Sequence, residues 1–150
     1  EFKINDLIKK VLNDFQSQIE AVNGQYEIES EDIEVSADLI CIKQIFENLI
    51  TNAIKYRSPD RLFKLKVSVI DMGADINIIF DDNGLGIKPG DEDKLFEEYY
   101  RSKARENTIA GHGIGLSTVK TLLESHGGMI WANPGVALGS SFNIQMPKKQ

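Results

Sequence analysis

Two stretches of alternating apolar residues, joined by a short polar turn, constrain the fold of this chain more than any other feature. Around a turn at residues 71–75, the alternating side chains are Leu65, Val67 and Val69 on one side and Ile76, Ile78 and Phe80 on the other. A period of two places such side chains on one face of a strand. We therefore expect a β-hairpin with one buried face, which a second layer must cover.

Three segments have the spacing of amphipathic helices and can supply that layer. Residues 3–22 and 37–55 place apolar side chains three and four positions apart, and a third helix is expected from Gly113 to Ser125. Ser36 or Asp38 should cap the second helix, because both residue types accept hydrogen bonds from a helix N-terminus.

Shorter elements complete the expected fold. They are strands near 26–29, 129–133 and 140–146, and a short helix at 91–100 that turns Leu95 and Phe96 inward. Because helices and strands do not alternate regularly, we expect an α+β protein with a two-layer α/β sandwich. Its sheet should be mixed and mostly antiparallel, with about five strands and about three helices on one face. The 150 residues fit a single domain.

Composition and charge exclude several classes of function. The formal net charge is -6, and no cluster of Lys and Arg exceeds three residues, which argues against a nucleic-acid groove. No apolar run approaches the roughly 20 residues of a membrane span, so the domain itself should not be membrane-inserted. The single cysteine, Cys41, lies in an apolar run and is expected to be a core residue in a reducing, cytoplasmic compartment.

Asn48 and Asn52 lie four residues apart on the second expected helix, with Lys55 and Tyr56 one turn further. Residues at this spacing share a helix face. Amide oxygens can bind Mg²⁺ and a lysine can reach a phosphate, so this face suits a metal-bound anion. The alternative is a solvated helix edge that ends in an asparagine cap.

Two glycine-containing segments are candidates for binding a ligand. Asp82-Asn83-Gly84-Leu85-Gly86 follows a strand, where its aspartate could accept a hydrogen bond from the exocyclic amine of adenine. The alternative is an ordinary turn, in which Asp-Asn-Gly is common. Gly111-His112-Gly113-Ile114-Gly115-Leu116 opens a helix, whose free N–H groups suit phosphate oxygens. Residues 101–112 between them are polar, and form either a lid over a ligand or a disordered surface loop.

In this order, the segments resemble the four sequence boxes of the histidine-kinase ATP-binding domain, a branch of the Bergerat-fold ATPases. The matching segments are Glu47-Asn48-Leu49-Ile50-Thr51-Asn52-Ala53-Ile54-Lys55-Tyr56 (N box), Asp82-Asn83-Gly84-Leu85-Gly86-Ile87 (G1), Leu95-Phe96-Glu97-Glu98-Tyr99-Tyr100-Arg101 (F) and Gly111-His112-Gly113-Ile114-Gly115-Leu116 (G2). Gly139-Ser140-Ser141-Phe142 is similar to a late element of the same family. The resemblance covers residues 36 to 147, and four boxes in order are far more specific than any one of them.

The resemblance implies ATP and Mg²⁺ as ligands and assigns the residues that hold the phosphates. Asn48 and Asn52 would hold Mg²⁺ against the phosphates, and Lys55 would contact phosphate. The lid would be anchored by Phe96, and Arg101 would reach a phosphate. The phosphate side of the lid would consist of Gly111, His112, Gly113, Ile114, Gly115 and Leu116.

The same resemblance assigns the adenine pocket. Asp82 would select adenine through its N6 amine, with support from Ser141 through water. Gly84 and Gly86 would let the backbone approach the base. The ring of Tyr56 would lie along adenine, and Ile87 would pack on it.

The resemblance further implies phosphoryl transfer from ATP to a histidine on a separate dimerisation domain, and then to the receiver domain of a response regulator. ATP-hydrolysing relatives usually carry a glutamate general base at the position of Asn48, and an amide cannot take a proton from water. Glu47 could instead be a general base for the acceptor histidine. Neither His112 nor His126 fits the acceptor, so the chain should bind ATP without autophosphorylating.

The chain begins Glu1-Phe2-Lys3 without a Met, and we expect it to be an excised piece of a longer protein, whose membrane anchoring is left open. Three other functions remain open. They are an ATPase switch that closes a dimer, an interaction module that has lost its nucleotide, and a Ser/Thr protein kinase of the anti-sigma type, which shares the fold. Steady phosphate release would indicate the first of these.

Overall fold

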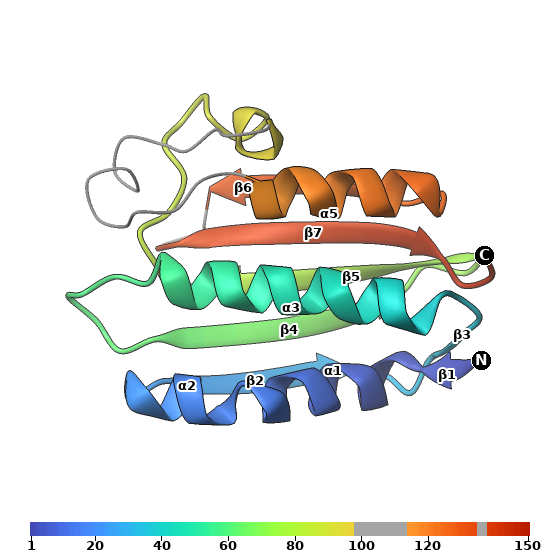
Figure 1. The fold of residues 1–150 in the computed structure, drawn as a ribbon, viewed down its shortest axis with the longest axis horizontal. Coiled ribbons are helices and arrows are strands. Elements are labelled where there is room, and N and C mark those ends of the chain that lie inside the picture. The colour runs from blue at the N-terminus through green and yellow to red at the C-terminus, as the bar shows by residue number, and fades with distance from the viewer. Residues whose placement is uncertain (98–113, 135–137) are drawn as a thin grey trace.

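The computed structural model describes residues 1–97, 114–134 and 138–150, and it arranges them in two layers (Figure 1). One layer is a sheet of five strands in the order β2 (Gln25–Ser30), β4 (Lys64–Asp71), β5 (Asp75–Asp82), β7 (Ser140–Pro147) and β6 (Met129–Pro134). Strand β2 runs parallel to β4, whereas the other neighbouring pairs are antiparallel. The α+β class and the mixed, mostly antiparallel sheet are confirmed.

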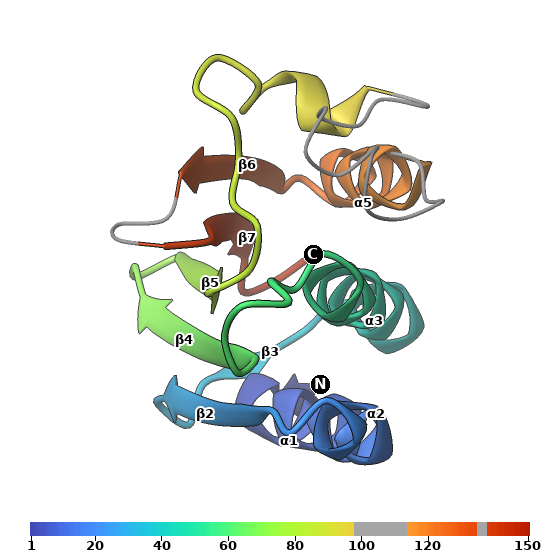
Figure 2. The same ribbon diagram turned by 90° about the vertical axis from the view of Figure 1, so that its left-hand side faces the viewer.

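The helices lie on one face of this sheet (Figure 2). They are α1 (Ile4–Asp14), α2 (Gln16–Ala21), α3 (Leu39–Lys55) and α5 (Ile114–Ser125). The helix expected at residues 3–22 is divided at Phe15, whose N–H donates to the carbonyls of both Val11 and Leu12. Of the described helices, none is long and apolar enough to cross a bilayer.

Three short elements add to the two layers. Strands β1 (Phe2–Lys3) and β3 (Glu34–Val35) form a separate antiparallel pair that was not expected from the sequence. The helix expected at residues 91–100 is a single 3-10 turn, η1 (Lys94–Phe96), within the described part. Its inward-facing Leu95 and Phe96 are confirmed, since both are buried.

The core lies between the two layers and follows the alternation of the hairpin. Phe80 on β5 pairs with Val67 on β4 and with Phe142 on β7, and all three are buried. The ring of Phe46 on α3 packs on Phe80 with 5.6 Å between centroids. The side chains of β5 that follow this alternation toward its end, Asp82 included, therefore project to the helix-covered face.

The N-terminus of helix α3 is capped by a side chain that accepts a hydrogen bond from a backbone N–H of the first turn. Asp38 Oδ1 accepts a hydrogen bond from the N–H of Cys41 at 3.1 Å, so Asp38 rather than Ser36 caps the helix. Cys41 is buried, as expected for a core residue, and burial followed by the nearby Asp38 charge raises the pKa of its thiol. A raised pKa keeps the thiol protonated and unreactive.

Replacement of Asp38 by alanine should remove this cap and lower the free energy of unfolding by about 1 kcal/mol. Urea unfolding followed by circular dichroism measures the change. Ser36→Ala is the matched control, because that side chain is the alternative cap, and we expect its midpoint to stay near that of the unmodified chain. An equal loss in both variants would contradict the assignment of the cap.

Candidate functional site

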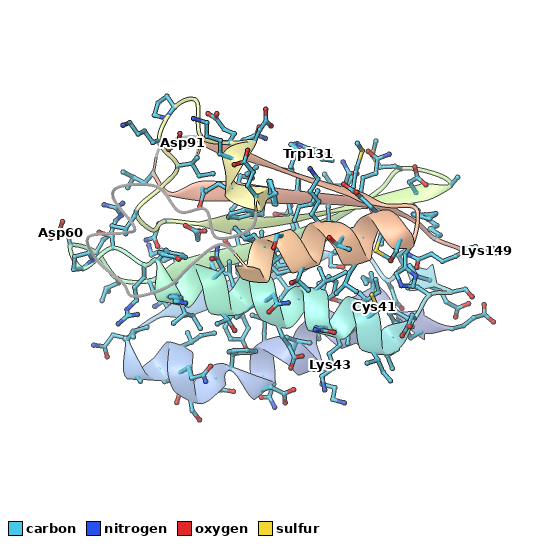
Figure 3. The ribbon with its side chains drawn as sticks, turned by 45° about the horizontal axis from the view of Figure 1, so that its top comes forward. Cys41, Lys43, Asp60, Asp91, Trp131 and Lys149 are labelled. Atoms are coloured by element: carbon cyan, nitrogen blue, oxygen red, sulfur yellow. The ribbon has the colours of Figure 1, made fainter. Side chains whose placement is uncertain are left out.

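Four segments far apart in the sequence meet at one end of the molecule. These are the C-terminal end of α3, the C-terminal end of β5, the start of β7 and the start of α5, all toward the left of Figure 1. Figure 3 shows Asp60, on the connection from α3 to β4, at this end and Lys149 at the opposite end. The residues predicted to bind a ligand fall largely into these four segments.

Helix α3 presents Asn48, Asn52 and Lys55 beside its buried stripe. The helix is continuous over Leu39–Lys55, so the three residues share one face as predicted, and each is partly exposed. Leu49 and Ala53, the residues that directly follow the two asparagines, are buried in the core. This border position leaves the amide groups accessible, while the neighbouring apolar side chains fix the helix beneath them.

Asp82 is the last residue of β5, and two hydrogen bonds orient its carboxylate. The N–H of Gly84 donates to Oδ1 at 2.9 Å, and the hydroxyl of Ser140 donates to Oδ2 at 3.0 Å. Because Phe80, two residues earlier, is buried under the helices, Asp82 projects toward the same side. The carboxylate is thus held in one orientation before any ligand arrives.

The hydroxyl that contacts Asp82 directly belongs to Ser140, which had no expected role, whereas Ser141 was expected to support Asp82 through water. Asp82 pairs with Ser140 across the β5–β7 ladder, and Asp81 pairs with Ser141. Alternation therefore places Ser141 on the opposite face of the sheet, where the side-chain amide of Asn143 lies 3.5 Å from its hydroxyl. The sequence could have indicated Ser140, because it lies two positions before the core residue Phe142 and so faces the same side of the strand.

The turn after β5 lies directly against the end of α3. The N–H of Leu85 donates to the carbonyl of Tyr56 at 3.0 Å, and a Cβ on Gly84 would lie 2.6 Å from the same oxygen. Gly86 has a φ of +84°, and a Cβ there would lie 3.1 Å from the carbonyl oxygen of Gly139. Glycine is thus required at residue 84 by contact and at residue 86 by conformation.

Gly139 was named in the late element of the resemblance but was given no role, and the structure places it at the site. It has a φ of +77°, and a Cβ would overlap the carbonyl of Asp82, so only glycine lets β7 begin so close to the end of β5. Tyr56 and Ile87 are both buried among protein atoms, which leaves their expected contacts with adenine as predictions. Glu47 is partly exposed on α3.

Phe96 and Leu116 pack into the core near the site. The ring of Phe96 meets that of Phe142 edge to face at 6.2 Å, and Leu116 on α5 is buried. The backbone of Gly115 is exposed in the first turn of α5. The predictions for Arg101, Gly111, His112 and Gly113 fall outside the described residues, as does the side chain of Ile114.

Comparison with known proteins identifies the family. Residues 37–150 match the family of histidine kinase-, DNA gyrase B- and HSP90-like ATPases. The chain belongs to this family. It is 35% identical over 144 residues to the sensor protein kinase WalK of Staphylococcus haemolyticus, and 34% identical to that of Staphylococcus saprophyticus. Each alignment covers 95% of this chain and 24% of the relative, so the chain spans about a quarter of the length of these curated relatives.

Solved structures place the chain within the family. The catalytic domain of histidine kinase ThkA superposes with a TM-score of 0.84 at 30% identity, covering 99% of this chain and 94% of that one. ThkA in complex with the response regulator TrrA superposes with a TM-score of 0.81 at 27% identity, covering 98% and 41%. The chain is therefore a domain of the histidine-kinase catalytic type.

Replacement of Gly84 by alanine should lower the free energy of unfolding by about 2 kcal/mol, because the added methyl group meets backbone that is part of the end of α3. Urea unfolding without nucleotide measures the loss. Gly115→Ala is the control, since no described atom lies within 4 Å of its Cβ position and alanine favours a helix. Equal losses in the two variants would contradict the close contact at Gly84.

Proposed function

We propose that this domain binds ATP with Mg²⁺ and transfers the γ-phosphoryl group to a histidine on a separate dimerisation domain of the same protein. The observation that carries the proposal is the carboxylate of Asp82, oriented by Gly84 and Ser140 at the end of the molecule toward which the C-terminal half of α3, with Asn48 and Asn52, extends. An oriented carboxylate acceptor suits the amine of a base, and two amides on one helix face suit a metal-bound phosphate chain.

The donor set fits a hard cation. Asn48 and Asn52 offer amide oxygens on one accessible helix face, and oxygen ligands are those that Mg²⁺ takes. Bound there, the cation would supply neutralisation of phosphate charge, which is the main requirement of phosphoryl transfer. Lys55 would bind phosphate from the next turn of the helix. Arg101 and the backbone N–H groups of residues 111–116 would contribute from the lid side.

Adenine would be selected by Asp82, which accepts a hydrogen bond from the N6 amine. Gly84 and Gly86 keep the backbone beside the base free of side chains, and Ile87 and Tyr56 would supply apolar contact. Ser140 acts through Asp82, because its hydroxyl already donates to Oδ2. Ser141 could take part only indirectly, since it projects from the other face of the sheet.

The chemistry assigned to Asn48 separates this domain from its hydrolysing relatives. An amide cannot remove a proton from water, so the phosphoryl group awaits an acceptor that a partner domain supplies. Glu47 is proposed as a general base toward that histidine. His126 follows the last turn of α5, where its N–H donates to the carbonyl of Leu123, which makes it part of a helix end. We therefore place the acceptor histidine outside this chain.

A response regulator is the proposed second partner. The support is the solved complex of histidine kinase ThkA with the response regulator TrrA, whose kinase resembles this chain in fold at 27% identity. The phosphoryl group would pass from the histidine of the dimerisation domain to the receiver domain. The cytoplasmic location expected from the sequence remains a prediction.

Thermal unfolding with Mg²⁺ and increasing ATP tests the nucleotide site. At an ATP concentration ten times its dissociation constant, binding adds about 1.4 kcal/mol, which raises Tm by about 3–6 °C for a domain of this size. Asp82→Asn should abolish the shift. With Oδ1 engaged by Gly84, an asparagine would turn its NH2 group toward the amine of the base, and two donors do not pair.

The matched control is Asp81→Asn, which removes the same charge from the neighbouring residue on the opposite face of the sheet. We expect this variant to keep the full shift with ATP. A shift that disappears in both variants, or a folded protein that shows none at several millimolar ATP, would contradict the proposal.

Phosphate release distinguishes phosphoryl transfer from hydrolysis. Incubated with Mg²⁺ and ATP, the chain by itself should release phosphate no faster than the buffer and should acquire no label from [γ-32P]ATP. The reasons are that Asn48 cannot take a proton from water, and that neither His112 nor His126 fits the acceptor. A colorimetric phosphate assay and filter binding provide the measurements. Steady release that Asn52→Ala eliminates would favour an ATPase switch instead.

A further inference from the structure

Arg61 lies on the connection between α3 and β4 and reaches the turn that follows β5. Its Nε donates to the carbonyl of Asn83 at 2.6 Å, and its Nη2 donates to the carbonyl of Gly84 at 2.7 Å. A guanidinium is a planar fork, and two donors on one rigid plane fix the directions of two successive carbonyls. Arg61 is only partly exposed, which reduces competition from water for these hydrogen bonds.

Asn83 also joins the turn after β5 to the segment that leads into β4, here through the side chain and backbone of the turn itself. We call this contact region, formed by Arg61, Leu62, Lys64, Asn83 and Gly84, the junction. Its Nδ2 donates to the carbonyl of Leu62 at 2.8 Å, and its Oδ1 accepts from the N–H of Lys64 at 2.9 Å. The backbone N–H of Asn83 also donates to the carbonyl of Lys64 at 3.3 Å. Together with the two bonds from Arg61, these contacts tie the turn to the connection from both sides.

The turn held in this way is the one that orients the carboxylate of Asp82. Gly84 receives the hydrogen bond from Arg61 through its carbonyl and donates to Asp82 Oδ1 through its N–H. Arg61 therefore binds the carbonyl of Gly84, and the carboxylate of Asp82 binds the N–H of the same residue. A displacement of Gly84 would move the N–H that holds Oδ1, while the Ser140 hydroxyl would still hold Oδ2.

We infer that Arg61 is a positioning residue for adenine recognition, which acts through Gly84 to hold the carboxylate of Asp82 in the orientation that accepts the N6 amine. The inference rests on the proposed function, since it assigns Asp82 to adenine. Arg61 touches the protein backbone and contributes no group to the ligand in this scheme. Its effect is therefore confined to the part of the binding free energy that depends on the 6-amino group.

The test compares two nucleotides that differ only in that group: ATP and purine riboside triphosphate, in which hydrogen replaces the amine. Dissociation constants with Mg²⁺ are measured by competition against a fluorescent ATP analogue, at a temperature where circular dichroism shows every variant folded. For Arg61→Ala, we expect about tenfold weaker binding of ATP, and less than a twofold change for purine riboside triphosphate. Arg61→Lys should behave in the same way, because one ammonium cannot replace the planar fork.

Arg57→Ala is the matched control on the same connection. The guanidinium of Arg57 donates to the carbonyl of Ile54 at 2.9 Å, within the last turn of α3. This variant should retain the preference for ATP. An equal loss of preference in Arg57→Ala, or an equal weakening of both nucleotides in Arg61→Ala, would show a general loosening of the site and overturn the inference.

Hydrogen exchange supplies a readout that needs no nucleotide. The N–H groups of Gly84 and Leu85 are bonded to Asp82 Oδ1 and to the carbonyl of Tyr56, and both should exchange at least about tenfold faster in Arg61→Ala. Unchanged exchange, or faster exchange with an intact preference for ATP, overturns the role of Arg61. If the unmodified chain does not distinguish the two nucleotides, the assignment of Asp82 to adenine fails and the inference fails with it. The exchange rates of Gly84 and Leu85 would still show, independently of nucleotide, whether Arg61 holds the turn in place.

Discussion

The register between β5 and β7 is the constraint on which the rest of the structure depends. It places Phe80 opposite Phe142 in the core and, at the end of the same two strands, places Asp82 opposite Ser140. A shift of one residue would turn both the apolar side chains and the carboxylate to the other face of the sheet. The burial of the core thus also determines where Asp82 projects.

Helix α3 combines core and site in the same way. Its buried residues hold it against the sheet. Asn48 and Asn52, which lie beside them on the helix, are therefore fixed in position although they are not themselves buried. The end of the helix then meets the turn after β5 through the carbonyl of Tyr56. A site built on packed elements keeps its geometry before ligand binding, and phosphoryl transfer depends mainly on such positioning.

Much of this architecture follows from local patterns. The alternation around residues 71–75 predicts the hairpin, and the spacing of apolar residues predicts α3 and α5 within a few residues of their observed ends. Asp38 was one of two proposed caps. Asn48, Asn52 and Asp82 could be singled out because amides on a helix face and an aspartate after a strand are chemically unusual. Periodicity and residue type suffice for these features, since each depends on neighbours within a few positions along the chain.

What the sequence by itself determined, then, is the hairpin, helices α3 and α5, and the polar groups that these elements present. The tertiary structure decided the parallel pairing of β2 with β4, the hydrogen bond from Ser140 to Asp82, and the contacts of Arg61 with the turn at residues 83–84. The partners in each case lie more than 20 residues apart in the chain. Local propensity cannot predict contacts between residues so far apart in the sequence. These contacts form only when the sheet register and the packing of α3 bring the segments together.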